Sequence, residues 1–305
     1  MFTAHPRFRR FKLGLKARLL ELRRRYVAAF RSYEPPALLQ ALRALGVRDG
    51  DSLMLHSGFA AHHGFRGSIE LLTDTFVQVV GPQGHLLMVS LPYRSSSLQY
   101  LSTLKQFDVR RTPSMMGLVS EFFRRRPEVQ RSLHPTHPML VRGPEAEWYV
   151  AGHEHCIHPC GPGTPFEKFA ERDGIVVFFN VPFGTFTFFH HLEHLVSAEL
   201  PFALYTEQRF EVKVIDRDGQ PGLVHTHVFT PEAIRRRRFE VLEQALRREG
   251  LIATSRIGNT RLEAVRVRAV IECVRAMSRN GRYFYDLTPA LTPAPSHADE
   301  GPRGG

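Results

Sequence analysis

The distribution of apolar residues along the chain predicts helices that alternate with buried strands. Leucine and aromatic residues recur at helical spacing over residues 11–31 and 36–46. Apolar segments at residues 53–57 and 85–90 predict strands, and the apolar run at 175–180 is typical of a strand buried on both faces. Such alternation predicts an α/β fold, a layered α/β/α sandwich around a mixed sheet.

Capping and turn residues predict further elements. Thr112 followed by Pro113 is a typical helix start, because threonine caps the first turn and proline suits the first helical position. Two alternating segments flank Asp218-Gly219 and predict a β-hairpin. The hairpin strands are expected at 209–215 and 223–229, and helices from Ser68, over 113–126, from about Thr185, over 231–250 and over 262–279.

The same pattern divides the chain into three parts. Residues 1–34 form a basic amphipathic helix and its connection, and residues 35–286 form one folded domain. Residues 287–305 are rich in Pro, Ala, Ser and Gly, so we expect a disordered tail.

Charge is concentrated at the N-terminal end. The net charge is +11, and residues 7–31 hold ten Lys or Arg against one acidic residue, Glu21. This arm suits either docking on the domain with a solvated basic face or weak contact with an anionic membrane surface. The overall basic balance also suits an anionic small ligand, and we expect no nucleic-acid partner.

Apolar segments and cysteines indicate the cellular compartment that the sequence suits. No apolar run approaches the ~20 residues of a membrane span, and no signal peptide is recognisable. Three cysteines, Cys156, Cys160 and Cys273, are too few for a disulfide framework, so a reducing, cytoplasmic location is expected.

The segment Arg131-Ser-Leu-His134-Pro-Thr-His137 is the most specific motif of the chain. Proline fixes φ and removes a donor, so His134-Pro135 forms a stiff, non-helical corner. The segment resembles the R-S-x-H-P-T-H signature of the aminoglycoside 3-N-acetyltransferase family, whose members move an acetyl group from acetyl-CoA to an amine. Here Pro138 follows the motif, where that family usually has serine.

Weaker matches to the same family follow in the family's order over residues 35–285. They are the His56-Ser57 strand end, the Gly81–Met88 hairpin-to-strand element, Phe107-Asp108 with Thr112–Gly117, the Asp173-Gly174 strand entry and the His190-x-x-Glu193 helix. The resemblance implies an antibiotic N-acetyltransferase-like fold and a cytoplasmic acyl-CoA-dependent N-acyltransferase that uses acetyl-CoA as co-substrate, a small amine as acceptor and no metal. It leaves the oligomeric state open.

The resemblance also implies roles for individual residues. His137 is expected to act as the general base in a direct transfer, with Glu154 or Glu193 orienting it. His190 and Glu193 are expected at the amine site. For CoA we expect a cap at Thr112 with Arg110 and Arg111 to hold phosphate, Ser57 and Thr136 to donate to the pantetheine amides, and His134 to support binding.

Other chemistries remain open at this point. His190-His-Leu-Glu193-His194 matches the H-x-x-E-H pattern of zinc proteases, and the cluster of His and Cys at residues 153–160 could form a metal site. Cys156 could accept an acyl group as a nucleophile. A non-catalytic or peripheral-membrane binding protein that uses the basic helix is the alternative from another functional class.

One position departs from the family pattern at the expected acceptor site. A carboxylate commonly stands six residues before the helix histidine in that family, and here the position is Gly184. The turn around it is rich in phenylalanine, including Phe183, Phe186 and Phe188. We therefore expect a less cationic acceptor than an aminoglycoside antibiotic, such as an amino sugar, that packs on these rings, and doubt a role in antibiotic resistance.

Overall fold

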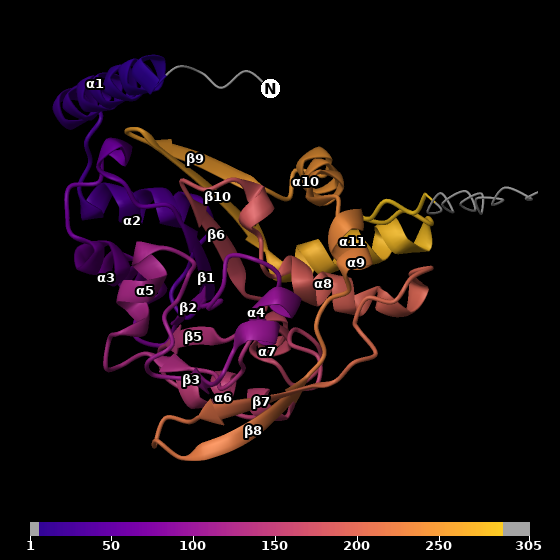
Figure 1. Ribbon diagram of the computed structural model, residues 1–305. Coiled ribbons are helices and arrows are strands. Elements are labelled where there is room, and N and C mark those ends of the chain that lie inside the picture. The colour runs from indigo at the N-terminus through magenta and orange to yellow at the C-terminus, as the bar shows by residue number, and fades with distance from the viewer. Residues whose placement is uncertain (1–5, 289–305) are drawn as a thin grey trace, which may run out of the picture.

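The computed structural model describes residues 6–288, and a seven-stranded mixed sheet lies at its centre (Figure 1). β1 pairs in parallel with β2 and with β6. β5 runs antiparallel to β2, and β10 runs antiparallel to β6. The strand order is β4 (Gln130–Arg131), β5 (Met139–Arg142), β2 (His85–Val89), β1 (Ser52–Ser57), β6 (Ile175–Phe179), β10 (Thr260–Arg266) and β9 (Ala253–Ile257).

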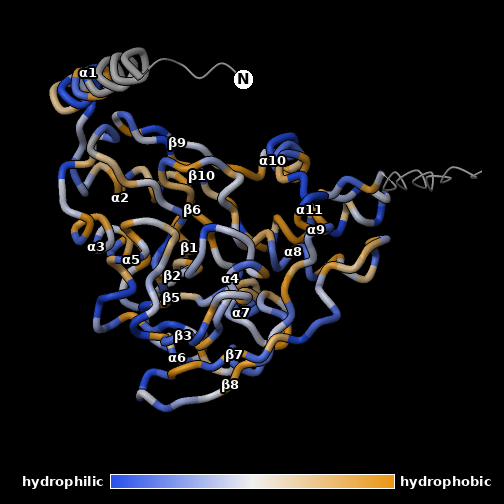
Figure 2. The backbone as a smooth tube through the Cα atoms, viewed as in Figure 1, coloured by the Kyte–Doolittle hydropathy of each residue, from blue (hydrophilic) through white to orange (hydrophobic). Residues whose placement is uncertain are grey.

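The central strands send alternate side chains into two separate hydrophobic clusters. In β1, Met54 packs in one cluster and Leu53 and Leu55 in the other; in β6, Val176 and Val177 divide in the same way. Successive residues of a strand point to opposite faces, so a run without polar residues fills both sides of the sheet. Figure 2 shows this as hydrophobic stretches along β6 and β10.

Helices cover both faces and complete the predicted three-layer architecture. One cluster is closed by α2 (Pro35–Ala44), α3 (Ile69–Val80) and α5 (Leu118–Arg124). The other is closed by α6 (Ala146–Val150), α7 (Pro165–Glu171), α8 (Phe189–Leu195), α9 (Pro231–Arg236), α10 (Phe239–Arg248) and α11 (Val267–Arg279). The prediction of an α/β/α sandwich around a mixed sheet is therefore confirmed.

Two parts lie outside these layers. The predicted hairpin is formed by β7 (Phe210–Ile215) and β8 (Pro221–Thr226), which join β3 (Phe107–Asp108) in a three-stranded sheet with its own small core. The N-terminal helix α1 (Pro6–Phe30) lies at the top left of Figure 1, outside the layers, and its last turns pack on the body, where Val27 is buried. The remaining elements are α4 (Ser97–Thr103) and the short 3-10 turns Ala61–His63, His153–His155, Phe183–Thr185 and Ser197–Glu199.

Three predicted helices differ from the structure. Thr112 accepts a hydrogen bond from the backbone N–H of Asp108 and closes a turn, and the helix begins only after Gly117, whose φ of +115° suits glycine. The predicted helix over 231–250 breaks at Arg237, which is extended. The start of the helix predicted over 262–279 is strand β10, because Leu262–Arg266 pairs with β6.

The proposed division of the chain into three parts stays a prediction. Most of the tail, residues 289–305, lies outside the described residues. Within residues 6–288 no helix is long and apolar enough to cross a membrane.

Candidate active site

The motif residues meet at one edge of the main sheet. β1, β2 and β6 are parallel, so their carboxyl ends share this edge, and β5 starts there because Met139 lies opposite Val89. A cavity of about 230 Å³ opens here, lined by Leu55, His56, Ser57, Val89, Met115, Met116, Ser120, Val181 and Thr185. Ligands of open α/β sheets bind at this kind of edge.

A buried carboxylate, Glu193, organises the polar groups on α8. Its Oε2 lies 2.7 Å from Nδ1 of His190, and Arg237 donates from Nε at 2.6 Å and from Nη2 at 2.9 Å. The hydroxyl of Tyr285 donates to Oε1. Glu193 is fully buried, and Arg237 supplies the counter-charge that a buried carboxylate requires.

These contacts define the protonation of His190. The carboxylate of Glu193 can only accept, so Nδ1 of His190 carries the proton and Nε2 keeps its lone pair. Burial and the charge of Arg237 lower the pKa of His190 although Glu193 opposes them. At neutral pH the ring is uncharged, and its 12% exposed side chain remains accessible to a substrate.

His137 lies directly beside His190. The two ring centroids are 5.5 Å apart and the planes are nearly perpendicular. Nδ1 of His137 lies 3.0 Å from the hydroxyl of Thr136, and burial together with His190 lowers its pKa well below the usual range. Two neutral imidazoles therefore share one site, walled by Phe229, which contacts both rings.

His134 and His153 form a buried stack beneath this pair. Their centroids are 4.5 Å apart at 20°. His153 lies 2.8 Å from the hydroxyl of Ser132 and donates from Nε2 to the carbonyl of Pro159, while Nδ1 of His134 accepts from the backbone N–H groups of the His-Pro-Thr-His corner. Burial lowers the pKa of His153 to about 3. The stack fixes the corner that carries His137.

Comparison with known proteins agrees with this geometry. The model of the family described as aminoglycoside 3-N-acetyltransferase matches residues 54–279. The chain belongs to this family. It is 29% identical over 196 residues to aminoglycoside N(3)-acetyltransferase III of Salmonella sp, covering 60% of this chain and 67% of that protein. It is 26% identical over 261 residues to aminoglycoside N(3)-acetyltransferase VII of Streptomyces paromomycinus, covering 77% and 88%.

Solved structures give the same fold. The structure of AAC-IIIb in a binary complex with CoASH superposes with a TM-score of 0.69 at 22% identity, over 82% of this chain and 97% of that one. The aminoglycoside acetyltransferase AAC(3)-Xa superposes with a TM-score of 0.71 at 21% identity, over 86% and 99%. The predicted family, fold and enzyme class, an acyl-CoA-dependent N-acyltransferase of the aminoglycoside 3-N-acetyltransferase type, are confirmed.

Of the residues predicted to contact CoA in this acetyltransferase, Ser57 lines the cavity at the end of β1. Thr136 and His134 have no exposed surface and support His137 instead. The predicted helix cap at Thr112 is wrong: Asp108 accepts the backbone N–H groups of Arg110 and Arg111, so no helix start directs free donors outward there.

The second carboxylate considered for the base lies elsewhere. Glu154 is 3.7 Å from the ring of His155, which is 84% exposed.

Burial raises the pKa of Cys156, which disfavours the thiolate that nucleophilic chemistry needs. Among residues 6–288, no three His, Cys, Asp or Glu side chains are arranged to hold a metal ion.

The phenylalanine-rich turn is part of the core and is not an acceptor surface. Phe183, Phe186 and Phe188 are each at most 1% exposed, so the expectation that an acceptor packs on them is wrong. Gly184 is exposed, and a Cβ atom there would meet nothing within 4 Å. A side chain would fit at Gly184, so the missing carboxylate changes the charge of this position and no steric limit explains the glycine.

The sequence alone did not indicate that Arg237, Tyr285 and Phe229 lie at the candidate active site. Arg237 stands in a run of four arginines within the segment predicted as one helix over 231–250, yet its side chain is only 13% exposed and pairs with Glu193. An acidic residue buried on a helix face is the one available signal, because it requires a cation somewhere in the fold.

Proposed function

We propose that this protein transfers the acetyl group of acetyl-CoA directly to an amine of an aminoglycoside-like or amino-sugar acceptor, with both substrates bound together. The amine nitrogen attacks the thioester carbonyl, the C–S bond breaks, and CoA leaves as the thiol. The nitrogen loses one proton to a histidine, which returns it to the departing sulfur. Because the amine attacks the thioester itself, the step needs no acyl-enzyme. The observation that carries the proposal is the His190–Glu193 pair at the sheet edge of a chain of this family.

The general base is better assigned to His190 than to His137, which the sequence alone selected. A carboxylate orients His190 and leaves its Nε2 as a base, in the manner of a histidine–carboxylate pair. His137 has only the hydroxyl of Thr136 at Nδ1, and that hydroxyl can either donate or accept. We assign His137 to the wall of the amine site, where its ring packs edge-on against that of His190.

The acetyl donor is assigned to the cavity at the ends of β1 and β2. Ser57 offers a hydroxyl there, and Met115 and Met116 offer apolar surface suited to a thioester and its pantetheine chain. Solved AAC-IIIb carries CoASH, which supports a CoA site in this fold.

A thermal-shift series with acetyl-CoA, CoA and pantetheine tests the donor. Binding at 100 times the dissociation constant adds about 2.7 kcal/mol to the free energy of unfolding. Steady-state kinetics with amino sugars and aminoglycosides then test the transfer. No melting-temperature shift with millimolar acetyl-CoA contradicts the proposal.

Membrane-surface contact through α1 is a second function, which the exposure of its apolar residues favours. Leu19, Leu22, Tyr26 and Phe30 are 53–74% exposed and recur at helical spacing on one side. Arg18, Arg23 and Arg24 accompany them on the same helix. An apolar stripe flanked by arginines suits the interface of an anionic bilayer, where the enzyme would work without being embedded.

A further inference from the structure

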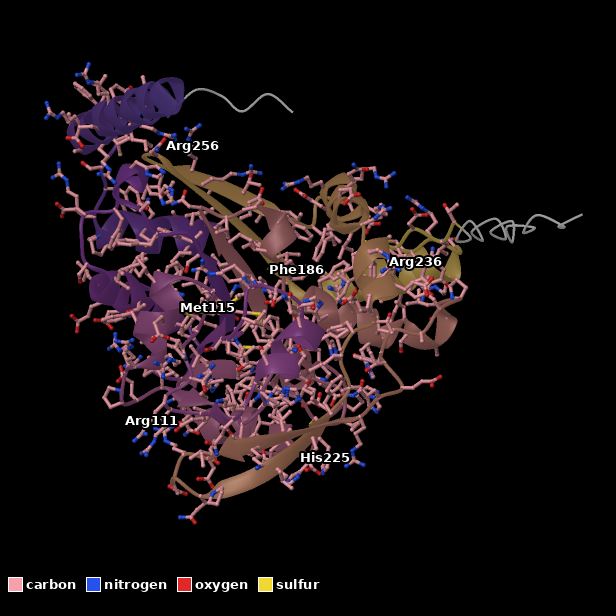
Figure 3. All side chains as sticks on the ribbon, viewed as in Figure 1. Arg111, Met115, Phe186, His225, Arg236 and Arg256 are labelled. Carbon is pink, nitrogen blue, oxygen red and sulfur yellow. The ribbon has the colours of Figure 1, made fainter. Side chains whose placement is uncertain are left out.

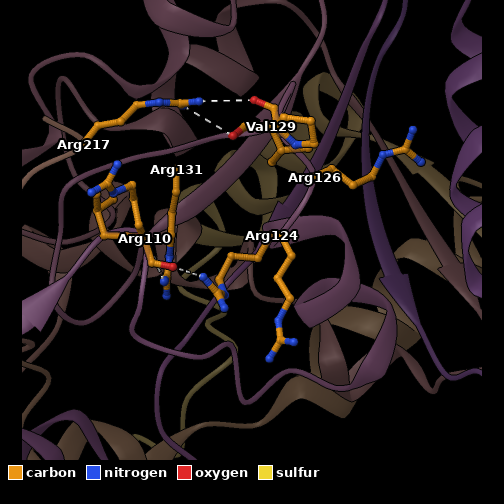
Figure 4. Close-up of a pocket in the computed structure, with 9 residues that line it drawn as sticks. Arg110, Arg124, Arg126, Val129, Arg131 and Arg217 are labelled. Carbon is orange, nitrogen blue, oxygen red and sulfur yellow. Dashed lines mark hydrogen bonds between the residues drawn. The ribbon is translucent and has the colours of Figure 1, made fainter.

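A second cavity differs from the histidine site in its chemistry, because arginine side chains form most of its lining. Its volume is about 310 Å³, and it lies between the end of α5, strand β4 and the hairpin of β7 and β8 (Figure 4). Its lining residues are Val109, Arg110, Arg124, Arg125, Arg126, Pro127, Val129, Arg131 and Arg217, and no acidic residue is among them.

Part of this charge is compensated from outside the cavity. Glu121 pairs with both Arg124 and Arg125, and its pKa is lowered to about 2 by them. Arg126 pairs with Asp74 and Glu128. These ion pairs explain how three arginines in a row can end a helix.

Three arginines of the cavity have no carboxylate within ion-pair distance in the described part of the chain. The guanidinium of Arg110 makes no hydrogen bond there, and that of Arg217 contacts only the backbone carbonyls of Val129 and Pro127. Arg131 is 9% exposed and donates to the carbonyls of Val109, Thr112 and Ser90, while its Nε has no partner. Figure 4 shows these side chains around one hollow.

Burying a guanidinium without an anion costs free energy. Burial disfavours the charged form of Arg131 in this way and lowers its pKa to about 9. A dianion in the cavity would supply the missing counter-charge to Arg110, Arg131 and Arg217 together. Guanidinium groups suit phosphate because their planar donors pair with its oxygens.

We propose that this arginine-lined cavity is a binding site for the phosphate group of a small molecule. The site does not depend on acetyl transfer. It is not the sheet-edge cavity, with which it shares no lining residue. The phosphate could come from a free phosphomonoester or from the 3′-phosphate of CoA, and the two sources are separable by experiment.

The first test uses the full chain and inorganic phosphate at constant ionic strength, followed by calorimetry and by melting temperature. We expect saturable binding that chloride does not reproduce. Arg110→Gln should weaken it by about ten-fold, because a charge-assisted contact is lost. Arg110 makes no side-chain hydrogen bond, so this variant should melt near the parent temperature without phosphate. Arg217→Gln provides the second variant.

Arg111→Gln is the matched control, since it removes the same charge from the adjacent, exposed residue that does not line the cavity. Equal phosphate affinity of the Arg110→Gln and Arg111→Gln proteins would overturn the proposal, as would binding no tighter than that of chloride. If Arg110→Gln weakens CoA but not 3′-dephospho-CoA, the source is CoA. If it weakens inorganic phosphate and neither nucleotide, the ligand is a separate phosphomonoester.

Discussion

His190 and Glu193 are three residues apart on α8, and Nδ1 of the histidine lies 2.7 Å from Oε2 of the carboxylate. This spacing places both side chains on one helix face. Arg237 closes the other side of Glu193, so the carboxylate remains charged in a fully buried position. The relationship sets one tautomer of His190, and for this reason we propose His190 as the base.

The first prediction concerns this pair. His190→Ala should lower kcat by roughly 10²–10⁴, the usual contribution of general-base catalysis, and leave the affinity for CoA nearly unchanged. His137→Ala should lower it less, because a neighbouring ring is lost and the oriented base remains. Turnover numbers and CoA titrations of both variants measure this. A larger loss in the His137→Ala enzyme would return the base to His137.

A second prediction follows from Glu193. Glu193→Gln should leave Arg237, whose side chain is only 13% exposed, without its carboxylate, which costs about 3–5 kcal/mol of stability, and should also lower kcat. Urea unfolding measures the first effect and single-turnover rates the second. Glu154→Gln is the control, because Glu154 contacts only an exposed histidine ring. Similar losses in the two variants would contradict the assigned role of Glu193.

The pH dependence of the reaction gives a third prediction. Burial and Arg237 lower the pKa of His190, and the unprotonated ring is the form that we propose as the base. Activity is therefore retained as pH falls through 6.5, the ordinary value for histidine, and is lost only at a lower pH. The acid limb of kcat/KM locates this pKa. A midpoint above 6.5 would require an anionic environment that favours the protonated form of the base, opposite to the effect of burial and Arg237 in the structure.

The fourth prediction is acid instability centred on His153. Its pKa is about 3 in the folded protein and near 6.5 when unfolded, so stability is present above pH 6.5 and falls as the unfolded chain takes up a proton. Between pH 7 and pH 5 this group alone removes about 2 kcal/mol. His153→Gln should show a smaller loss over that interval in urea unfolding. Identical slopes for the two proteins would exclude His153 as the cause.

The sequence predicted the layers because the central strands are apolar on both faces, a pattern that helices on two sides must cover. It failed where a residue's partner is remote. Residues 262–266 look like the start of a helix until β6 pairs with them, and the capping pattern at Thr112 is used to close a turn. The same reason hid Arg237, whose role depends on Glu193, 44 residues away.

The sequence also showed which residues are charged or apolar without showing where in the fold their side chains lie. The phenylalanines of residues 183–188 were recognised as a group, but nothing in the sequence separates a core turn from a binding wall. The arginines of the second cavity come from four separate segments, so their convergence belongs to the fold alone.

The final prediction returns to the acceptor. An aminoglycoside carries several ammonium groups, and Gly184 stands where the family commonly has a carboxylate. Gly184→Asp should fit, because a Cβ there meets nothing within 4 Å. The position is exposed, so the new charge pair is worth at most about 1 kcal/mol, which corresponds to a two- to five-fold rise in kcat/KM for gentamicin-type acceptors. Amino sugars with one amine should gain less. Gly184→Asn has nearly the same shape without the charge and serves as the control. A gain in the asparagine variant equal to that in the aspartate variant would mean that shape, and not the missing carboxylate, limits the antibiotic as a substrate.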